Sequence, residues 1–151
     1  MIDTQLASFL EEGIFIALAT CNERLEPSGA RGVAAVVEPD GTHLVVFVTT
    51  LGAADVLPTL ESSGQAAVCF ARPPDERACQ VKGAFAGSRA ASDDERDLVQ
   101  GQWSRWLDRL GTIGLVPAFE HWPSWPCVAI RVRVGDIFNQ TPGPGAGAPL
   151  S

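Results

Sequence analysis

The stretch "FVTTLGAADVLPTL", Phe47 to Leu60, joins the end of an apolar run to a helical segment. The apolar run ends at Thr49-Thr50, Gly52 permits a turn, and residues 53–62 have the composition of a short helix. A strand that turns into a helix presents backbone N–H groups and the positive end of the helix dipole, which favour a bound anion. The stretch contains no Lys or Arg, and Ala53-Ala54-Asp55 stands where a cation would be expected. It therefore predicts a strand, a turn and a helix, and it leaves open whether the joint binds a phosphate.

The predicted strands on either side of this joint come in consecutive runs. Residues 14–20 are almost continuously apolar, which predicts a strand with both faces buried. The turn signal at residues 38–41 joins the next two strands into a hairpin. The other predicted strands span residues 30–37, 43–49, 65–70, 77–86 and 127–134. Because helices do not separate these strands one by one, their order favours an antiparallel β-barrel or sheet with peripheral helices (α+β), and not a doubly wound fold.

Two further helices flank the predicted strands. A first helix is capped at residues 3–4 and ends at Gly13, and a long helix starts at the capping box of residues 92–95. The apolar stripe of the long helix, which predicts packing against the sheet, consists of Val99, Trp103, Trp106 and Leu110. Trp122 and Trp125 stand between prolines, and they are interpreted either as a wall over a flat ligand or as part of a packed loop.

Composition argues against several classes of function. The 151 residues carry a formal net charge of −7, and an acidic surface repels nucleic acid. No apolar run approaches the ~20 residues that a membrane span needs, and residues 1–4 lack the features of a signal peptide. The four cysteines form no CxxC pair, so they are interpreted as small core residues of a cytoplasmic protein.

The sequence lacks the common catalytic and metal-binding motifs. It contains no G-x-S-x-G, no G-x-G-x-x-G and no P-loop. The two histidines, His43 and His121, are far apart and show no metal-ligand spacing, so no metal is predicted. Tyrosine is absent, no catalytic residue can be named, and any redox chemistry is expected to come from a cofactor.

Five segments of the chain occur in an order that points to a known family. They are "GIFIALAT", "PSGARGVAAVV", "LVVFVTTLGAADVL", "AAVCFARP" and "CQVKGAFAG". Together they resemble the pyridoxamine 5′-phosphate oxidase-like family, the flavin-binding split β-barrels. The resemblance runs from Leu6 to about Gly147, and the ending "IFNQTPGPGAG" is similar to the tail of some members. The chain is accordingly divided into a split-barrel domain, residues 1–138, and a Pro/Gly-rich tail, residues 139–151.

The resemblance implies a homodimer that binds flavin mononucleotide (FMN) at each end of the subunit interface. It implies an oxidoreductase that acts on a small molecule. Arg31 is expected to help hold the phosphate, and the backbone of residues 32–35 is expected to run beside the flavin ring. The cofactor-binding residues that the resemblance implies are Arg31, Gly32, Val33, Ala34, Val48, Thr49, Thr50, Ala54, Gln80 and Lys82.

The chain departs from the family pattern after the third strand. A Ser and a Lys or Arg are usual there, and Ala53-Ala54-Asp55 replaces them. Asp55 is expected to repel a phosphate dianion, and the loss of one charge-assisted contact costs about 1.5–3 kcal/mol. Two alternatives therefore stay open. The barrel has lost FMN and works as a binding or accessory subunit, or it binds a deazaflavin or haem in the same cleft, with His43 or His121 as the haem ligand.

Overall fold

The computed structural model describes residues 1–150 and contains six strands, three α-helices and two short 3₁₀ helices. In chain order the elements are α1 (Thr4–Leu10), β1 (Phe15–Cys21), β2 (Pro27–Val37), β3 (His43–Thr49), α2 (Thr50–Ser63), β4 (Gln65–Ala71), β5 (Ala78–Ala90), η1 (Asp93–Glu95), α3 (Arg96–Gly111), η2 (Val116–Ala118) and β6 (Cys127–Asn139).

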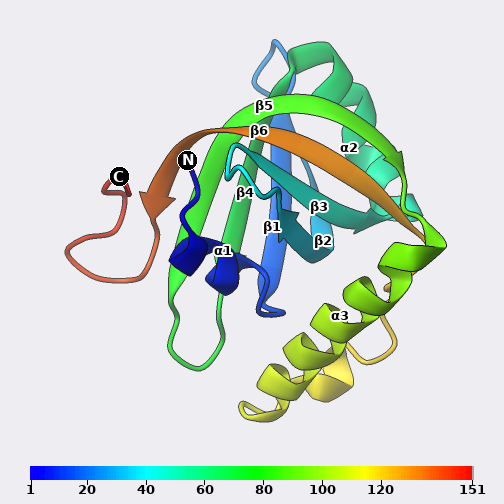
Figure 1. Ribbon diagram of the computed structural model, residues 1–151, viewed down its shortest axis with the longest axis vertical. Helices are drawn as coiled ribbons and strands as arrows, with labels where there is room; N and C mark the ends of the chain where they lie inside the picture. Colours follow the sequence, from blue (N-terminus) through cyan, green and yellow to red (C-terminus); the bar gives the residue numbers. More distant parts are fainter. Residues whose placement is uncertain (151) are drawn as a thin grey trace.

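The strands form one closed antiparallel barrel in the order β1-β2-β3-β6-β5-β4 (Figure 1). The predicted hairpin is present, because β2 pairs with β3 and Val37 opposes Leu44 across the turn. Long, curved β5 and β6 pass over the front of the barrel, and α3 lies outside it (Figure 1). The predicted α+β barrel with peripheral helices is therefore confirmed. In the ring of six strands, β2 and β5 stand opposite each other.

The prediction that β1 is buried on both faces was wrong. Its side chains alternate, with Ile16 and Leu18 in the barrel interior and Phe15 and Ala19 exposed outside. The apolar run misled because its outward residues are mostly alanines, which are small enough to stand on a barrel surface without exposing much apolar area.

The barrel interior holds the main hydrophobic core. Val46, Val68 and Val81 are fully buried there, and α2 adds Val56 and Leu60 to the same cluster. Most inward strand positions are thus filled by aliphatic or aromatic side chains, as expected for a small barrel in which side chains fill the inside, and Thr20 of β1 is a buried polar exception.

A second cluster lies between α3 and the outer face of β2, β3 and β6. It holds the predicted stripe, since Val99, Trp103, Trp106 and Leu110 are all buried. A β-bulge between Gly32 and Ala34 inserts one residue into β2. Both Val33 and Ala34 consequently join this outer cluster, whereas strict alternation would have turned one of them inward.

The pairing of β1 with β2 ends at Gly32, opposite Ile16. Beyond Gly32, side chains from outside the barrel hydrogen-bond to the backbone of β2. Gln102 of α3 accepts from the backbone N–H of Ala35 (3.0 Å) and donates to its C=O (2.7 Å). Glu11 accepts from the N–H of Val37 (2.7 Å). These contacts satisfy backbone groups that the diverging strand leaves without a β1 partner.

The cysteines were only in part interpreted correctly. Cys79 and Cys127 are buried, and burial raises the pKa of each thiol to about 12. Cys21 and Cys69 are half-buried on the outer side of the barrel. All four are free thiols.

The tail folds back along the barrel. Strand β6 continues to Asn139, whose N–H donates to the C=O of Ala148, and Phe138 forms a bridge with Pro149. Thr141 hydrogen-bonds the backbone of Ala78, at the start of β5. Apart from that single bridge, residues 140–150 contain turns and bends, as the Gly/Pro composition predicts.

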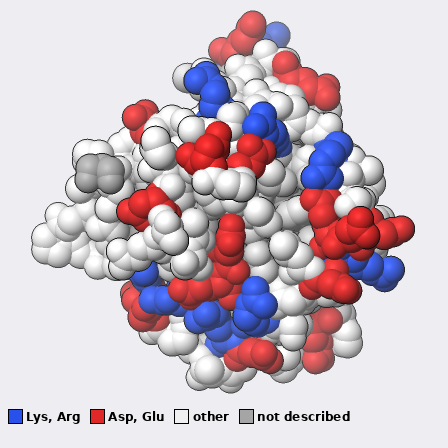
Figure 2. All heavy atoms as spheres, in the orientation of Figure 1, with Lys and Arg blue, Asp and Glu red and all other residues white. Residues whose placement is uncertain are grey.

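No helix within residues 1–150 is long and apolar enough to cross a membrane. Acidic and basic side chains are interspersed on the face seen in Figure 2.

Candidate anion site at the start of helix α2

The stretch from Phe47 to Leu60 folds without the turn that was predicted at Gly52. Helix α2 starts directly after β3, with Thr49 as its N-cap, and Gly52 lies inside the first helical turn. The N–H of Gly52 donates to Thr49 Oγ1 (3.2 Å), and the N–H of Thr50 donates to the C=O of Pro126 (3.0 Å). Two of the N–H groups that a helix start normally leaves free are therefore already used.

Arg31 of β2 lies beside this helix start. A pocket of about 270 Å³ opens there, and its lining residues include Arg31, Thr49, Gly52, Asp55 and Trp122. The pocket thus combines the arginine of β2, the end of β3 and the first turn of α2. These are the three parts that the resemblance assigned to a phosphate site.

Aromatic rings surround the guanidinium of Arg31. Its carbon Cζ lies 3.8 Å from the centre of the Trp106 ring, and the other rings around it are Trp103 at 4.5 Å, Trp122 at 4.9 Å and Phe119 at 5.8 Å. A cation over an aromatic face is stabilised by the ring quadrupole, most strongly when water is excluded. We call Arg31 with these four rings the arginine cage.

The arginine cage holds its cation without a counter-charge. No carboxylate within residues 1–150 forms an ion pair with Arg31. The Nε–H of Arg31 is buried and has no acceptor among the same residues. Burial lowers the pKa of the guanidinium to about 10, so it stays charged at neutral pH. Asp55 is exposed and lines the same pocket, where its negative charge would repel an anion.

Sequence reasoning missed the arginine cage. It interpreted Trp103 and Trp106 only as residues that pack the helix against the sheet, and it gave Phe119 no role. Of the two tryptophans interpreted as a wall over a ligand or as part of a packed loop, Trp122 lines the pocket and is 46% exposed, whereas Trp125 packs against the outer cluster. The role of Trp122 as a wall over a ligand stays a prediction. The sequence features that could have pointed to the cage are the several tryptophans and the arginine near the start of a predicted strand. Their spacing along the chain does not show that the tryptophan rings and the guanidinium are in contact.

The other residues expected near the phosphate or ring have different environments. Val48 points into the barrel core and Ala34 is completely covered in the outer cluster. Gly32 faces Ile16, and a Cβ there would lie 2.5 Å from Ile16 Cγ2, so this position requires glycine. Thr50 donates its hydroxyl to the C=O of Pro126 (3.2 Å), and Ala54 is exposed on α2.

Gln80 and Lys82 lie on β5, across the barrel from Arg31. Gln80 Nε2 donates to Cys69 Sγ (3.2 Å), and Lys82 is exposed. Lys82 lines a separate, larger cleft of about 500 Å³, together with Ala19, Ala67 and Asp136. These residues stand in register on neighbouring strands. One chain therefore does not bring all ten predicted residues to one site.

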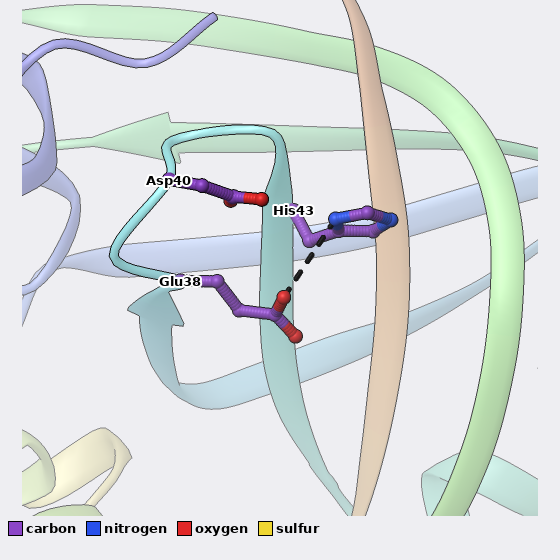
Figure 3. A group of neighbouring side chains, drawn as sticks. All are labelled: Glu38, Asp40 and His43. Carbon is purple, nitrogen blue, oxygen red and sulfur yellow. Dashed lines mark ion pairs between the residues drawn. The ribbon is translucent and has the colours of Figure 1, made fainter.

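A cluster of potential metal ligands lies elsewhere, at the turn between β2 and β3 (Figure 3). Glu38 accepts two hydrogen bonds from Arg131 (2.6 and 2.7 Å), which hold the pKa of its carboxyl below the usual range. Asp40 accepts from the backbone N–H and the hydroxyl of Thr42, and His43 Nδ1 lies 3.6 Å from Glu38. Because these contacts already neutralise and orient the carboxylates, we assign the cluster to stabilisation of the turn.

No protein-family model matches the chain, and no curated protein sequence matches it. Several solved structures are similar to it. HupZ of Group A Streptococcus has a TM-score of 0.59 at 14% identity and covers 97% of this chain and 100% of its own. A proposed pyridoxamine 5′-phosphate oxidase of Lactobacillus delbrueckii has a TM-score of 0.55 at 15% identity, over 90% and 93% of the two chains. A structure called F420 reductase has a TM-score of 0.53 at 17% identity, over 86% and 93%.

These similarities extend over almost the full length of both partners in each comparison. The fold is therefore the pyridoxamine 5′-phosphate oxidase-like split barrel, and the resemblance first detected in the sequence is confirmed at that level. At 14–17% identity the comparisons define the fold, and function has to be argued from the arginine cage and its pocket.

Proposed function

We propose that this protein is a dimeric flavin-binding oxidoreductase that holds the phosphate end of FMN at Arg31 and acts on a small molecule. The observation that carries the proposal is the state of Arg31: a cation enclosed by aromatic rings, with a buried Nε–H that has no acceptor within residues 1–150. Buried donors are normally satisfied, and a charged donor gains most from an anionic acceptor.

The pocket fits one end of such a cofactor. At about 270 Å³ it lies below the roughly 300–1,000 Å³ of pockets that enclose a drug-sized ligand. It has room for a phosphate and the adjoining chain. Trp122 and the exposed Leu51 supply apolar walls at its mouth. The flat ring system therefore needs further walls beyond this pocket.

A second copy of the chain would supply those walls. Arg31 and Lys82 stand on opposite strands of one chain, which supports a ligand position between two subunits, with Arg31 from one and Lys82 from the other. The outer surface of β1 and β4 suits such a contact, because it is built of small, partly exposed side chains: Ala17, Ala19, Ala67, Cys69 and Ala71. Gln80 and Lys82 continue this surface onto β5 and would face the ring from the second subunit.

The residues have distinct tasks in this proposal. Bound FMN would supply hydride transfer. Arg31 would bind and orient the phosphate, with Thr49 at its side. Trp122 would exclude water from the ion pair, which strengthens the attraction between guanidinium and phosphate. Lys82 would place positive charge near the ring, where charge develops on reduction.

The test compares FMN with riboflavin, which lacks the phosphate. The purified protein is examined for flavin absorbance, stripped, and titrated with each compound. Arg31→Gln is expected to weaken FMN about tenfold or more and riboflavin little. Arg24→Gln is the matched control, because Arg24 is exposed in the loop before β2. A protein that binds neither compound at micromolar concentration would contradict the proposal.

One observation favours a second candidate. Asp55 lines the Arg31 pocket, and no basic side chain within residues 1–150 forms an ion pair with it. This suits a cofactor with a less highly charged acidic group, such as a deazaflavin, or a barrel that has lost its cofactor and binds a partner. Haem is distinguished by its absorbance. Its axial ligand would be His43 or His121, and His121 is the more accessible of the two, with a side chain that is 89% exposed.

A further inference from the structure

Two side chains of the arginine cage each carry a buried donor without an acceptor within residues 1–150. Besides the Nε–H of Arg31, the indole Nε1–H of Trp106 is buried and has no acceptor within residues 1–150. The Trp106 side chain is only 2% exposed, and its ring centre lies 3.8 Å from Arg31 Cζ. The remaining donor of this kind in the described chain, Arg109 Nε, belongs to a different group of residues, at the ion pair with Glu12.

Two unsatisfied buried donors are not expected side by side by chance. Native proteins leave few buried polar groups without a partner, and each one destabilises the fold. Trp is a donor only and Arg has no acceptor atoms, so the two side chains cannot satisfy each other. One acceptor-rich group between them would satisfy both, and a tetrahedral oxyanion offers several oxygens to separate donors.

We propose that Trp106 is the second donor of the arginine cage, and that its indole N–H and the Arg31 guanidinium together bind one oxyanion. The inference rests on the proposed function, for which the anion is the phosphate of the cofactor. It adds a binding residue from α3, an element that the resemblance did not connect with the phosphate. Trp122 is the most exposed of the rings around Arg31 and lines the pocket, so the anion would reach the two donors past this side chain.

Trp103 provides a matched control. It is almost as deeply buried, at 6% exposure, and it stacks on the same guanidinium at 4.5 Å, yet its N–H is not one of the buried donors without an acceptor. Trp106→Phe and Trp103→Phe each remove one indole and keep an aromatic ring over Arg31. Only Trp106→Phe removes a buried donor that has no acceptor within residues 1–150.

The experiment uses inorganic phosphate as the probe. The chain has four tryptophans, so ¹⁵N-labelled protein gives four indole N–H signals, which Trp→Phe variants assign. Phosphate is expected to move the Trp106 signal downfield on the unmodified protein, which makes this result independent of how any variant folds. Calorimetry is expected to show phosphate binding weakened about tenfold in Trp106→Phe and no more than about twofold in Trp103→Phe.

The outcomes separate this inference from the proposed function. An unmoved Trp106 signal at saturating phosphate, or equal weakening in both variants, would overturn the role of Trp106 while leaving FMN binding at Arg31 intact. If Trp106→Phe weakens FMN but not riboflavin, the oxyanion is the cofactor's phosphate; if it weakens inorganic phosphate alone, the site serves a free anion. If phosphate produces neither heat nor a shift, both the anion site and its second donor are rejected.

Discussion

The side chain of Gln102 makes two hydrogen bonds to the backbone of a single residue, Ala35, where β2 parts from β1. Gln102 is 3% exposed and Ala35 is fully buried, so water cannot replace these bonds. The pair fastens α3, and with it the tryptophans of the arginine cage, to the strand that carries Arg31.

Gln102→Leu keeps the apolar packing of the side chain and leaves one N–H and one C=O of Ala35 without partners. We expect the free energy of unfolding to fall by about 2–6 kcal/mol, because two buried groups lose their partners and each unsatisfied buried group costs about 1–3 kcal/mol. Urea unfolding measures the change. Ser104→Ala on the exposed side of the same helix is the control and should stay within about 0.5 kcal/mol. A similarly small change for Gln102→Leu would contradict the assigned role.

Asp55→Asn tests the electrostatics of the pocket. The substitution removes the negative charge that lines the Arg31 pocket. Because Asp55 is exposed, we expect a gain of only about threefold in FMN affinity, on the order of 0.7 kcal/mol, and a smaller gain at high salt. Glu61→Gln, at the far end of the same helix, is the control. An unchanged affinity at low salt would show that Asp55 does not act on the ligand.

Ala67→Arg tests the second subunit. Ala67 lies on the outer side of β4 between Ala19 and Lys82, in the surface proposed to meet the partner. A long charged side chain there is expected to convert a dimer into a monomer, measured by light scattering after size exclusion, and to lower FMN affinity with it. Ala90→Arg, at the exposed end of β5, should leave the dimer intact. A dimer that persists in Ala67→Arg places the interface elsewhere.

Glu95 gives a prediction for acid stability. Its carboxylate accepts two hydrogen bonds from Arg89, both 2.7 Å, and one from the N–H of Ser92, and mainly the Arg89 contact lowers its pKa from 4.5 to about 2. Because the pKa of Glu95 is lower in the folded protein than in the unfolded chain, its contribution to stability is complete when the pH lies above the pKa of the unfolded chain. That contribution is lost as the pH falls to the pKa of the folded protein. Glu95→Gln should therefore be less stable at neutral pH and lose less stability between about pH 5 and pH 2. Glu23→Gln, in the exposed loop before β2, should behave like the unmodified protein.

The fold was largely readable from the sequence, and the site only in part. The succession of strands and helices along the chain, the hairpin and the stripe of α3 follow from local patterns, and those patterns hold in the structure. The bulge after Gly32 was not predictable, because it depends on how β2 fits between Ile16 and Val46. For the same reason, spacing could not reveal that Trp106 covers Arg31. That contact joins residues 75 positions apart, on a helix and a strand that Gln102 and the outer hydrophobic cluster hold together.

The position of β2 and β5 on opposite sides of the barrel predicts that two defective variants can complement each other. If each cofactor lies between Arg31 of one subunit and Lys82 of the other, a two-fold dimer contains two sites, and each subunit contributes a different half to each of them. A subunit defective at Arg31 and a subunit defective at Lys82 would then be inactive as separate homodimers. Mixed together, they would form heterodimers with one intact site and one doubly defective site. Co-expressed Arg31→Gln and Lys82→Ala chains would regain up to half of the normal cofactor content per heterodimer, a complementation that a barrel working alone could not show.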